Sequence, residues 1–220
     1  MRKVEEAVWT TLLPRTPVFT TRRAAETTGV RLDVASRALR KLANRGAITR
    51  IMRGVWADTK HPDFSPYAVV PYLVRDVDSN NTAYVSLLSA LSLHGMIEQI
   101  PRVIQVIVGK QRPAVRTRVG LYEFHQLQAN LLGGFVPYRQ TGNFDIATPA
   151  KALFDTLYLS ARRGRRFSRL PELTLVTGFS EAELEEWIHR IDLQRLRLGV
   201  ARRWQQLRAE SGPVLTHVIR

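Results

Sequence analysis

Hydrophobic positions and helix-stopping residues divide the start of the chain into short segments. We expect a first helix from about Lys3 to Leu13, followed by Pro14 and Pro17, since proline cannot continue a helix. A second helix is expected to begin after Thr20 as N-cap and to end at Gly29, because hydroxyl side chains favour the first position and glycine the last. The chain therefore opens with two short helices joined by a brief connection.

A third helix is predicted within four residues of the second. Its N-cap is expected to be Asp33, and Gly46 lies where a helix end favours positive φ. The intervening apolar residues are spaced at i, i+3, i+4 and i+7, which places them on one face: Ala35, Ala38, Leu39 and Leu42. The opposite face is polar and carries three cations.

Two β-prone runs follow this helix, Ala47–Met52 and Val55–Ala57, and Arg53-Gly54 between them predicts a tight hairpin. Helix, helix, short turn, helix and hairpin is the order of a winged helix-turn-helix. In that arrangement a helix enters the major groove of DNA and the hairpin tip contacts neighbouring phosphates or the minor groove. We therefore predict a DNA-binding domain over residues 1–60.

The predicted DNA-binding residues come from the polar face of the third helix and from the hairpin. They are Ser36, Arg37, Arg40, Lys41, Asn44, Arg50 and Arg53. The helix cations would contact guanine or neutralise phosphate, the shorter side chains would add hydrogen bonds, and the hairpin arginines would supply the charge of the wing. The alternative is a merely solvated helix face, or a winged helix that binds protein. The scarcity of acids on this face favours DNA.

After residues 61–66, which contain two prolines and form the predicted boundary, the pattern becomes a mixture of helices and strands. The predicted strands cover 103–108, 119–126, 133–139 and 144–147. The predicted helices cover 66–74, 86–93, 149–158, 181–191 and 193–207, of which the last carries an apolar stripe that packs on its own domain or forms a dimer seam. The expected fold class is α+β: a winged helix-turn-helix followed by a mixed α/β domain, residues 61–220, ending in helices.

Charge strengthens the case for a polyanionic partner. The 220 residues hold 33 Lys and Arg against 19 Asp and Glu, a net charge of +14, and residues 1–60 hold 13 basic and 5 acidic residues. Coding bias towards arginine would raise the total as well. A second basic cluster follows the helix at 149–158: Arg162, Arg163, Arg165, Arg166 and Arg169. It is either a contact for DNA backbone, RNA or an acidic protein, or a solvated loop.

Other chemistry has little support in the sequence. Cysteine is absent, and the five histidines show no metal-ligand spacing, so we expect neither a metal nor another cofactor. Asp145, Asp155 and Glu123 would be the acids of a nuclease, but no lysine follows at the spacing of such enzymes. No signal peptide or run of about eighteen apolar residues is present. We therefore expect a cytoplasmic protein that is not an enzyme.

Three blocks of the chain resemble a known family. They are YVSLLSALSLHGMIEQIPR (84–102), GLYEFHQL (120–127) and IATPAKALFDTLYL (146–159). Together with a preceding winged helix, they resemble the AbiEi-type antitoxins of type IV toxin–antitoxin systems, over about residues 1–160. Ala150 stands where the family commonly has Glu, and Thr156 where Leu is common. The missing Glu is expected to weaken the start of that helix slightly.

The resemblance implies a division of labour. The N-terminal domain would bind inverted repeats in the operon's own promoter and repress it, so that two copies of the protein meet on DNA. The C-terminal domain would act as antitoxin against a nucleotidyltransferase toxin, without a lasting complex between the two. The alternative is a stand-alone transcription factor whose C-terminal domain senses a signal or dimerises. An enzyme acting on nucleic acid is a more distant alternative.

Overall fold

The computed structural model describes residues 2–14, 16–74, 82–140, 142–162 and 171–210. Its contacts divide the chain into two compact units. Residues 1–76, 115–121 and 138–144 form the N-terminal unit, and residues 77–114, 122–137 and 145–220 form the C-terminal unit. The N-terminal unit thus includes two short segments that come much later in the sequence than the predicted boundary.

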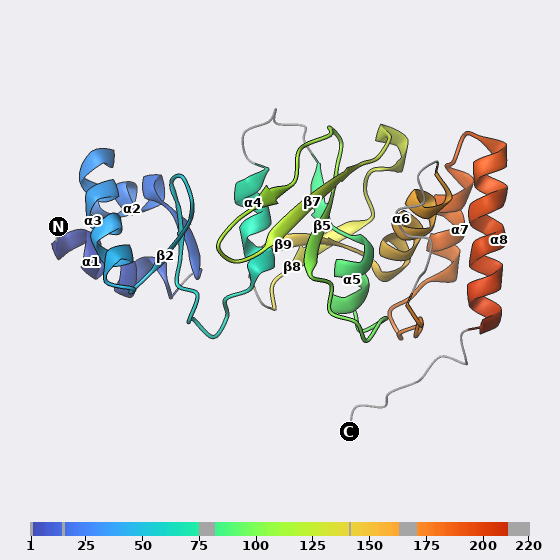
Figure 1. Ribbon diagram of the computed structural model, residues 1–220, viewed down its shortest axis with the longest axis horizontal. Coiled ribbons are helices and arrows are strands. Elements are labelled where there is room, and N and C mark those ends of the chain that lie inside the picture. The colour runs from blue at the N-terminus through green and yellow to red at the C-terminus, as the bar shows by residue number, and fades with distance from the viewer. Residues whose placement is uncertain (1, 15, 75–81, 141, 163–170, 211–220) are drawn as a thin grey trace, which may run out of the picture. The chain divides into compact units, whose positions relative to one another are not determined.

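The helices of the N-terminal unit are α1 (Arg2–Ala7), which continues as a π-helical turn η1 (Val8–Leu12), α2 (Thr21–Thr28) and α3 (Leu32–Asn44) (Figure 1). The predicted ends of α2 are confirmed. The Thr20 hydroxyl accepts the Arg23 N–H at 3.1 Å, and Gly29 adopts a φ of 67°. Glycine reaches this left-handed conformation without the steric cost that a Cβ atom imposes.

The start of α3 differs from its prediction. The helix begins at Leu32 with Arg31 as N-cap, and Asp33 lies in its first turn. The prediction that Asp33 caps the helix is therefore wrong. Its carboxylate contacts two guanidinium groups, those of Arg31 and Arg37, each at 3.2 Å. The predicted apolar stripe is confirmed, since all four of its residues are buried.

The hairpin is confirmed and belongs to a small sheet. Its strands β2 (Thr49–Met52) and β3 (Val55–Ala57) are antiparallel, and Gly54 in the turn has a φ of 76°. A strand that the sequence did not predict, β1 (Val18–Thr20), pairs with the other edge of β3, which gives the order β1-β3-β2. The helices and this sheet enclose one core: Val4, Val8, Leu12, Leu13, Phe19, Ala24, Ala38, Leu39, Leu42, Ile48 and Trp56.

The rest of the N-terminal unit begins with a 3-10 turn, η2 (Pro66–Val69), and the short helix α4 (Val70–Leu73), where a single helix was predicted over 66–74. A later segment packs on this turn. Tyr67 stacks on Phe144 with ring centroids 5.6 Å apart. A Cβ atom on Gly142 would approach the Ala68 side chain to 2.7 Å, so only glycine fits there.

The C-terminal strands form a six-stranded sheet of order β6-β7-β5-β4-β9-β8, in which β4 is antiparallel to β5 and parallel to β9. The strands are β4 (Ala83–Val85), β5 (Val103–Val108), β6 (Val115–Arg116), β7 (Leu121–Gln126), β8 (Phe135–Tyr138) and β9 (Phe144–Ala147). The predictions for β5 and β9 are confirmed in full. Those for β7 and β8 extend a few residues too far, and β4 and β6 were not predicted.

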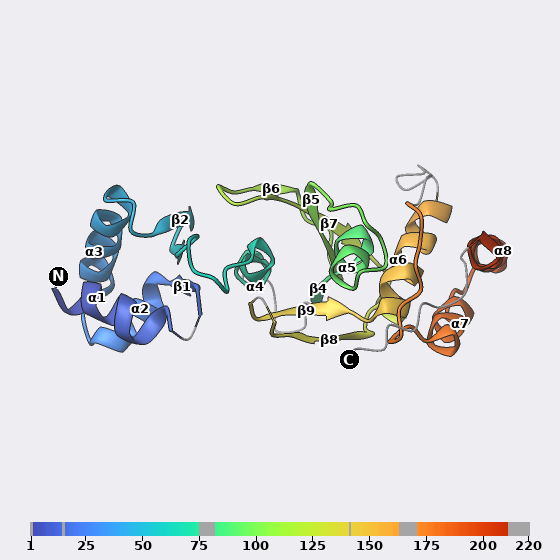
Figure 2. The same cartoon turned by 90° about the horizontal axis from the view of Figure 1, so that it is seen from below.

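The helices that accompany this sheet are α5 (Leu87–Leu93), a 3-10 turn η3 (Ala129–Leu131), α6 (Pro149–Ala161), α7 (Glu181–His189) and α8 (Gln194–Glu210). α5 packs on β5 and on α6, and α6 in turn contacts α7 and α8 (Figure 2). Thr148 caps α6 through the Lys151 N–H, and Ser180 caps α7 through the Glu183 N–H. The chain is a mixed α+β protein that ends in helices.

Candidate nucleic-acid interface

The polar face of α3 is exposed as predicted. The Arg37, Arg40, Lys41 and Asn44 side chains lie in solvent, and Ser36 is half-buried. A rotation of 100° per residue places all five on the side opposite the buried stripe. Arg40 donates hydrogen bonds to the Ser36 carbonyl at 3.3 Å and to its hydroxyl at 3.4 Å. This face of α3 is therefore available to a partner.

The hairpin and the start of α3 enclose an open hollow of about 790 Å³. Four of the seven predicted residues line it: Ser36 and Arg40 from α3, and Arg50 and Arg53 from the hairpin. Arg31, which the sequence analysis did not select, lines it as well. Arg37, Lys41 and Asn44 lie on the same helix outside the hollow. The structure thus brings one predicted helix cation, Arg40, together with the two hairpin arginines on one surface.

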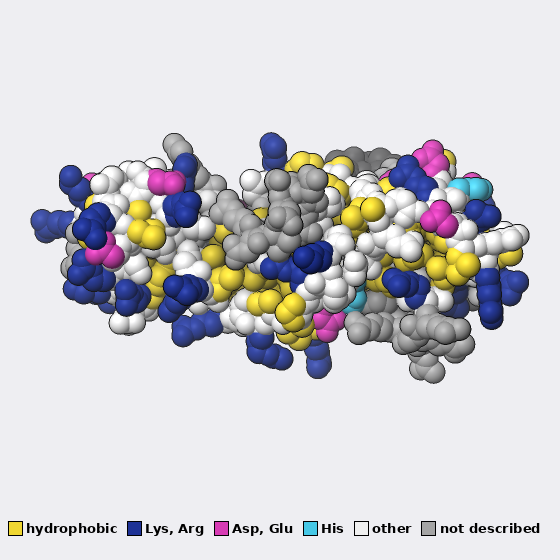
Figure 3. Space-filling model, turned by 90° about the horizontal axis from the view of Figure 1, so that it is seen from above, with side chains coloured by type: hydrophobic (Ala, Val, Ile, Leu, Met, Phe, Trp, Pro, Cys, Tyr) yellow, Lys and Arg dark blue, Asp and Glu magenta, His cyan; other side chains and the backbone are white. Residues whose placement is uncertain are grey.

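A second hollow of about 850 Å³ also borders the hairpin tip. Arg53 and Gly54 line both hollows. The second hollow adds Arg22 and Arg23, two exposed arginines of the first turn of α2. The sequence offered a signal for both, since they are adjacent cations directly after a helix N-cap. The space-filling view shows Lys and Arg side chains in dark blue over the N-terminal unit, with few carboxylates between them (Figure 3).

One of the two hairpin arginines rests on a buried tryptophan. Arg50 lies over the ring of Trp56, with 5.8 Å from its guanidinium carbon to the ring centroid. The Trp56 indole N–H donates to the Thr21 hydroxyl at 2.8 Å in the buried interior. Since Thr21 begins α2, this contact ties β3 to the helices. The orientation of the hairpin relative to α3 is therefore set by the core.

Few carboxylates neutralise this surface. Within the described part of the chain, the ion pairs of the first 57 residues are Arg31–Asp33, Arg37–Asp33 and Arg45–Glu5. Arg40, Arg50 and Arg53 have no carboxylate partner among the described residues. Within the described residues, the charge of these three arginines is therefore not balanced by an ion pair.

The second basic cluster falls largely outside the described residues. Arg163, Arg165, Arg166 and Arg169 lie in the segment 163–170, which the structure does not describe. Arg162 is exposed at the end of α6. Its guanidinium carbon lies 5.7 Å from the centroid of the Tyr158 ring.

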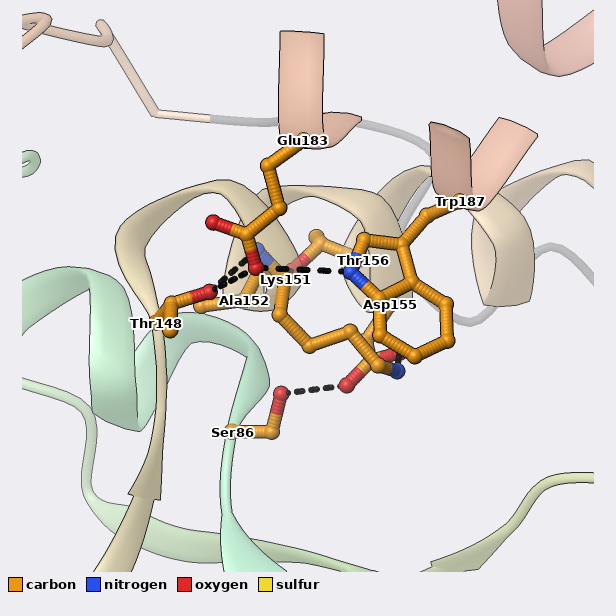
Figure 4. Close-up of polar contacts among 8 residues, drawn as sticks. All are labelled: Ser86, Thr148, Lys151, Ala152, Asp155, Thr156, Glu183 and Trp187. Atoms are coloured by element: carbon orange, nitrogen blue, oxygen red, sulfur yellow. Dashed lines mark hydrogen bonds and ion pairs between the residues drawn. The ribbon is translucent and has the colours of Figure 1, made fainter. Parts of the chain in front are cut away.

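The C-terminal unit holds a polar cluster of another kind, centred on a fully buried ion pair (Figure 4). Lys151 forms an ion pair with Asp155, one helical turn further along α6, and both side chains are inaccessible to solvent. The Ser86 hydroxyl donates to the second Asp155 oxygen at 2.7 Å. Burial lowers the pKa of Lys151 and raises the pKa of Asp155, and their mutual contact opposes both shifts.

Aromatic rings and a second carboxylate surround this pair. The Lys151 ammonium lies 4.6 Å from the Trp187 ring centroid and 5.0 Å from that of Phe154. Glu183 accepts hydrogen bonds from the Thr148 hydroxyl at 2.6 Å and from the Trp187 indole at 3.4 Å. The cluster therefore joins α6 to α7 and to the start of α5. Sequence reasoning missed it, because a Lys and an Asp four residues apart usually lie on an exposed helix face.

The residues considered for nuclease chemistry are not arranged as a metal site. Asp155 is committed to Lys151 and Ser86. No group of three or more His, Asp or Glu side chains within the described ranges is placed to hold a metal ion. None of the helices in those ranges has the length and hydropathy to cross a bilayer.

Comparison with known proteins assigns no family to the chain. No protein-family model matches it, and the search of curated proteins gives no match either.

Proposed function

We propose that residues 2–57 form a winged helix-turn-helix that binds double-stranded DNA. In this proposal α3 is the recognition helix and the β2–β3 hairpin is the wing. The observation that carries it is the shared hollow, where Ser36 and Arg40 of α3 face Arg50 and Arg53 of the hairpin. Three cations from two separate elements converge on one concave surface and lack carboxylate partners among the described residues: Arg40, Arg50 and Arg53.

The arrangement suits the geometry of a duplex. An α-helix fits the major groove, and the strand of phosphates beside that groove would pass the hairpin arginines. Arg and guanine form bidentate hydrogen bonds, whereas phosphate contacts give affinity without sequence information. We expect the α3 side chains to contribute to sequence preference and Arg50 and Arg53 to contribute mainly to affinity.

We further propose that the protein represses its own operon and serves as the antitoxin of a type IV system. Three sequence blocks support this part of the proposal by their resemblance to AbiEi-type antitoxins. They contribute to one packed interior: Ser86 of the first block bonds Asp155 of the third, and the Tyr122 and Phe124 side chains of the second are buried. The functional partner would be a nucleotidyltransferase toxin. A neighbouring gene of that class is the simplest check.

DNA binding is tested with duplexes enriched from a random-sequence library by the wild-type protein, and with shuffled versions of the same sequences. Affinity should fall with salt, with a log–log slope of about −0.9 for each phosphate neutralised. The double variant Arg40→Ala, Arg53→Ala should bind more weakly with a shallower slope. Its matched control is Arg195→Ala, Arg202→Ala on the exposed face of α8, which removes the same charge. Salt-independent binding, or equal losses in both variants, would contradict the proposal. Repression further requires that the enriched sequence occur as an inverted repeat in the protein's own promoter.

A further inference from the structure

Asp33 is the one acidic residue of α3, and it lies on the surface to which the proposed function assigns DNA. It lines the same hollow as Arg31, Ser36 and Arg40. A carboxylate in this place repels phosphate, so it lowers the affinity for any duplex. A surface selected only for attraction to DNA would not carry it.

Both oxygens of Asp33 have a cationic partner. Oδ1 accepts from Nε of Arg31, and Oδ2 accepts from a terminal nitrogen of Arg37, each at 3.2 Å. Arg31 precedes α3 and Arg37 lies one turn into it. One carboxylate therefore bridges two guanidinium groups across the first turn of the helix and fixes the direction of both.

The two ion pairs themselves add little stability, although a carboxylate in the first turn favours the start of a helix. The Arg31, Arg37 and Asp33 side chains are 87%, 63% and 55% exposed, and ion pairs in solvent contribute little to folding. Orientation matters much more for recognition. An arginine distinguishes guanine only when its planar fork meets the O6 and N7 edge, whereas a free arginine binds the nearest phosphate of any sequence.

We infer that Asp33 is a positioning residue that determines sequence specificity. It holds Arg37, and with it Arg31, in a direction suited to base edges, and its charge disfavours the relaxed phosphate contacts of non-cognate DNA. This inference rests on the DNA-binding function proposed above. According to this inference, Asp33 lowers the affinity for every duplex. It also increases the ratio of cognate to shuffled affinity.

The test compares Asp33→Asn with the wild type on an enriched duplex and its shuffled version. Asparagine keeps the size of the side chain and removes the charge. We expect the shuffled duplex to bind more tightly, with a salt slope steeper by about 0.9 to 1.8 as one or two arginines reach phosphate. The ratio of cognate to shuffled affinity should fall about tenfold, the discrimination of one good base contact. Asp33→Glu should retain much of the ratio.

Three further measurements make the outcome decisive. Glu6→Gln removes the same charge from the exposed side of α1 and should leave the ratio unchanged. In an Arg37→Ala background, Asp33→Asn should lose the part of its effect on the ratio that acts through Arg37, and only the part that acts through Arg31 should remain. Thermal unfolding of Asp33→Asn shows whether Asp33 only stabilises the start of α3.

Equal tightening on both duplexes, or an unchanged ratio with lowered thermal stability, would overturn the inference and leave DNA binding intact. A wild-type protein that binds no duplex would overturn the proposed function instead. An effect that persists fully without Arg37 would show that Asp33 does not act through Arg37, which contradicts the proposed positioning of that side chain.

Discussion

The two polar clusters of this protein contain similar residues in opposite environments. On α3 and the hairpin, the cations lie in solvent, and Arg40, Arg50 and Arg53 have no carboxylate partner among the described residues. In the C-terminal unit, Lys151 and Asp155 are inaccessible to solvent and bonded to each other. The first cluster leaves its charge for a partner, and the second satisfies it internally.

The difference has an energetic meaning. Removing an ion from water costs several kcal/mol, which a close counter-ion and further hydrogen bonds must offset. Lys151 and Asp155 meet that requirement with one another and with Ser86. Exposed arginines carry no such cost and contribute little to folding. We therefore expect substitutions in the buried cluster to affect stability and substitutions in the exposed cluster to affect binding.

The largest effect is expected from Lys151→Met, which leaves Asp155 buried without its counter-ion. Breaking a buried pair in this way costs about 3–5 kcal/mol of unfolding free energy. Urea unfolding followed by circular dichroism measures the loss. The double variant Lys151→Met, Asp155→Leu should recover most of the stability, because no isolated charge remains. A single variant as stable as the wild type would show that the pair is not required.

An intermediate effect is expected from Arg37→Ala and Arg40→Ala on α3. Each should weaken binding to an enriched duplex by about 1–3 kcal/mol if the side chain contacts a base. Fluorescence anisotropy on the enriched and shuffled duplexes separates the two modes, since a phosphate contact weakens both alike. Urea unfolding should be nearly unchanged in both variants. A loss of stability similar to that of Lys151→Met would remove the contrast between the clusters.

The smallest effect is expected on the pH dependence of stability, when His94 is replaced. The Nε2 of His94 donates to the Ala147 carbonyl at 2.7 Å. Burial lowers the pKa of His94 below its usual 6.5, so the folded state favours the neutral ring. Its contribution to stability is complete above pH 6.5 and is lost as the pH falls through the lowered pKa. Urea unfolding at several pH values should show this decline, and His94→Gln should flatten it. An identical pH profile in the variant would contradict the assignment.

Local signals made much of the architecture predictable. Thr148-Pro149 marks the start of α6, and the β-branched run Val103–Val108 is a buried strand, because each depends on nearby residues alone. Strand β1 could not be predicted, because its three residues pair with β3, which is distant in the sequence. Phe19, for example, lies opposite Trp56. The exposed face of α3 was predictable from its helical period. That Arg31 lines the hollow could not be predicted, because it depends on how the hairpin packs beside the start of α3.

The buried cluster was beyond prediction for the same reason. Lys151 and Asp155 are four residues apart, a spacing that most often indicates an exposed pair. Trp187 and Ser86 come from remote parts of the sequence and contact the Lys151–Asp155 pair, whose side chains are inaccessible to solvent. Only the tertiary structure shows whether such a Lys–Asp pair is buried or exposed.

Residues 138–144 belong to the N-terminal unit although they are synthesised late, which affects the order in which this unit folds. Tyr67 packs on Phe144, and Gly142 lies against Ala68, so these early residues obtain their partners only after residue 144 has left the ribosome. The core formed by residues 4–56 has no such requirement. On a translating ribosome, we expect the three-helix core to form first, while the turn at Pro66–Val69 waits for most of the second half of the chain.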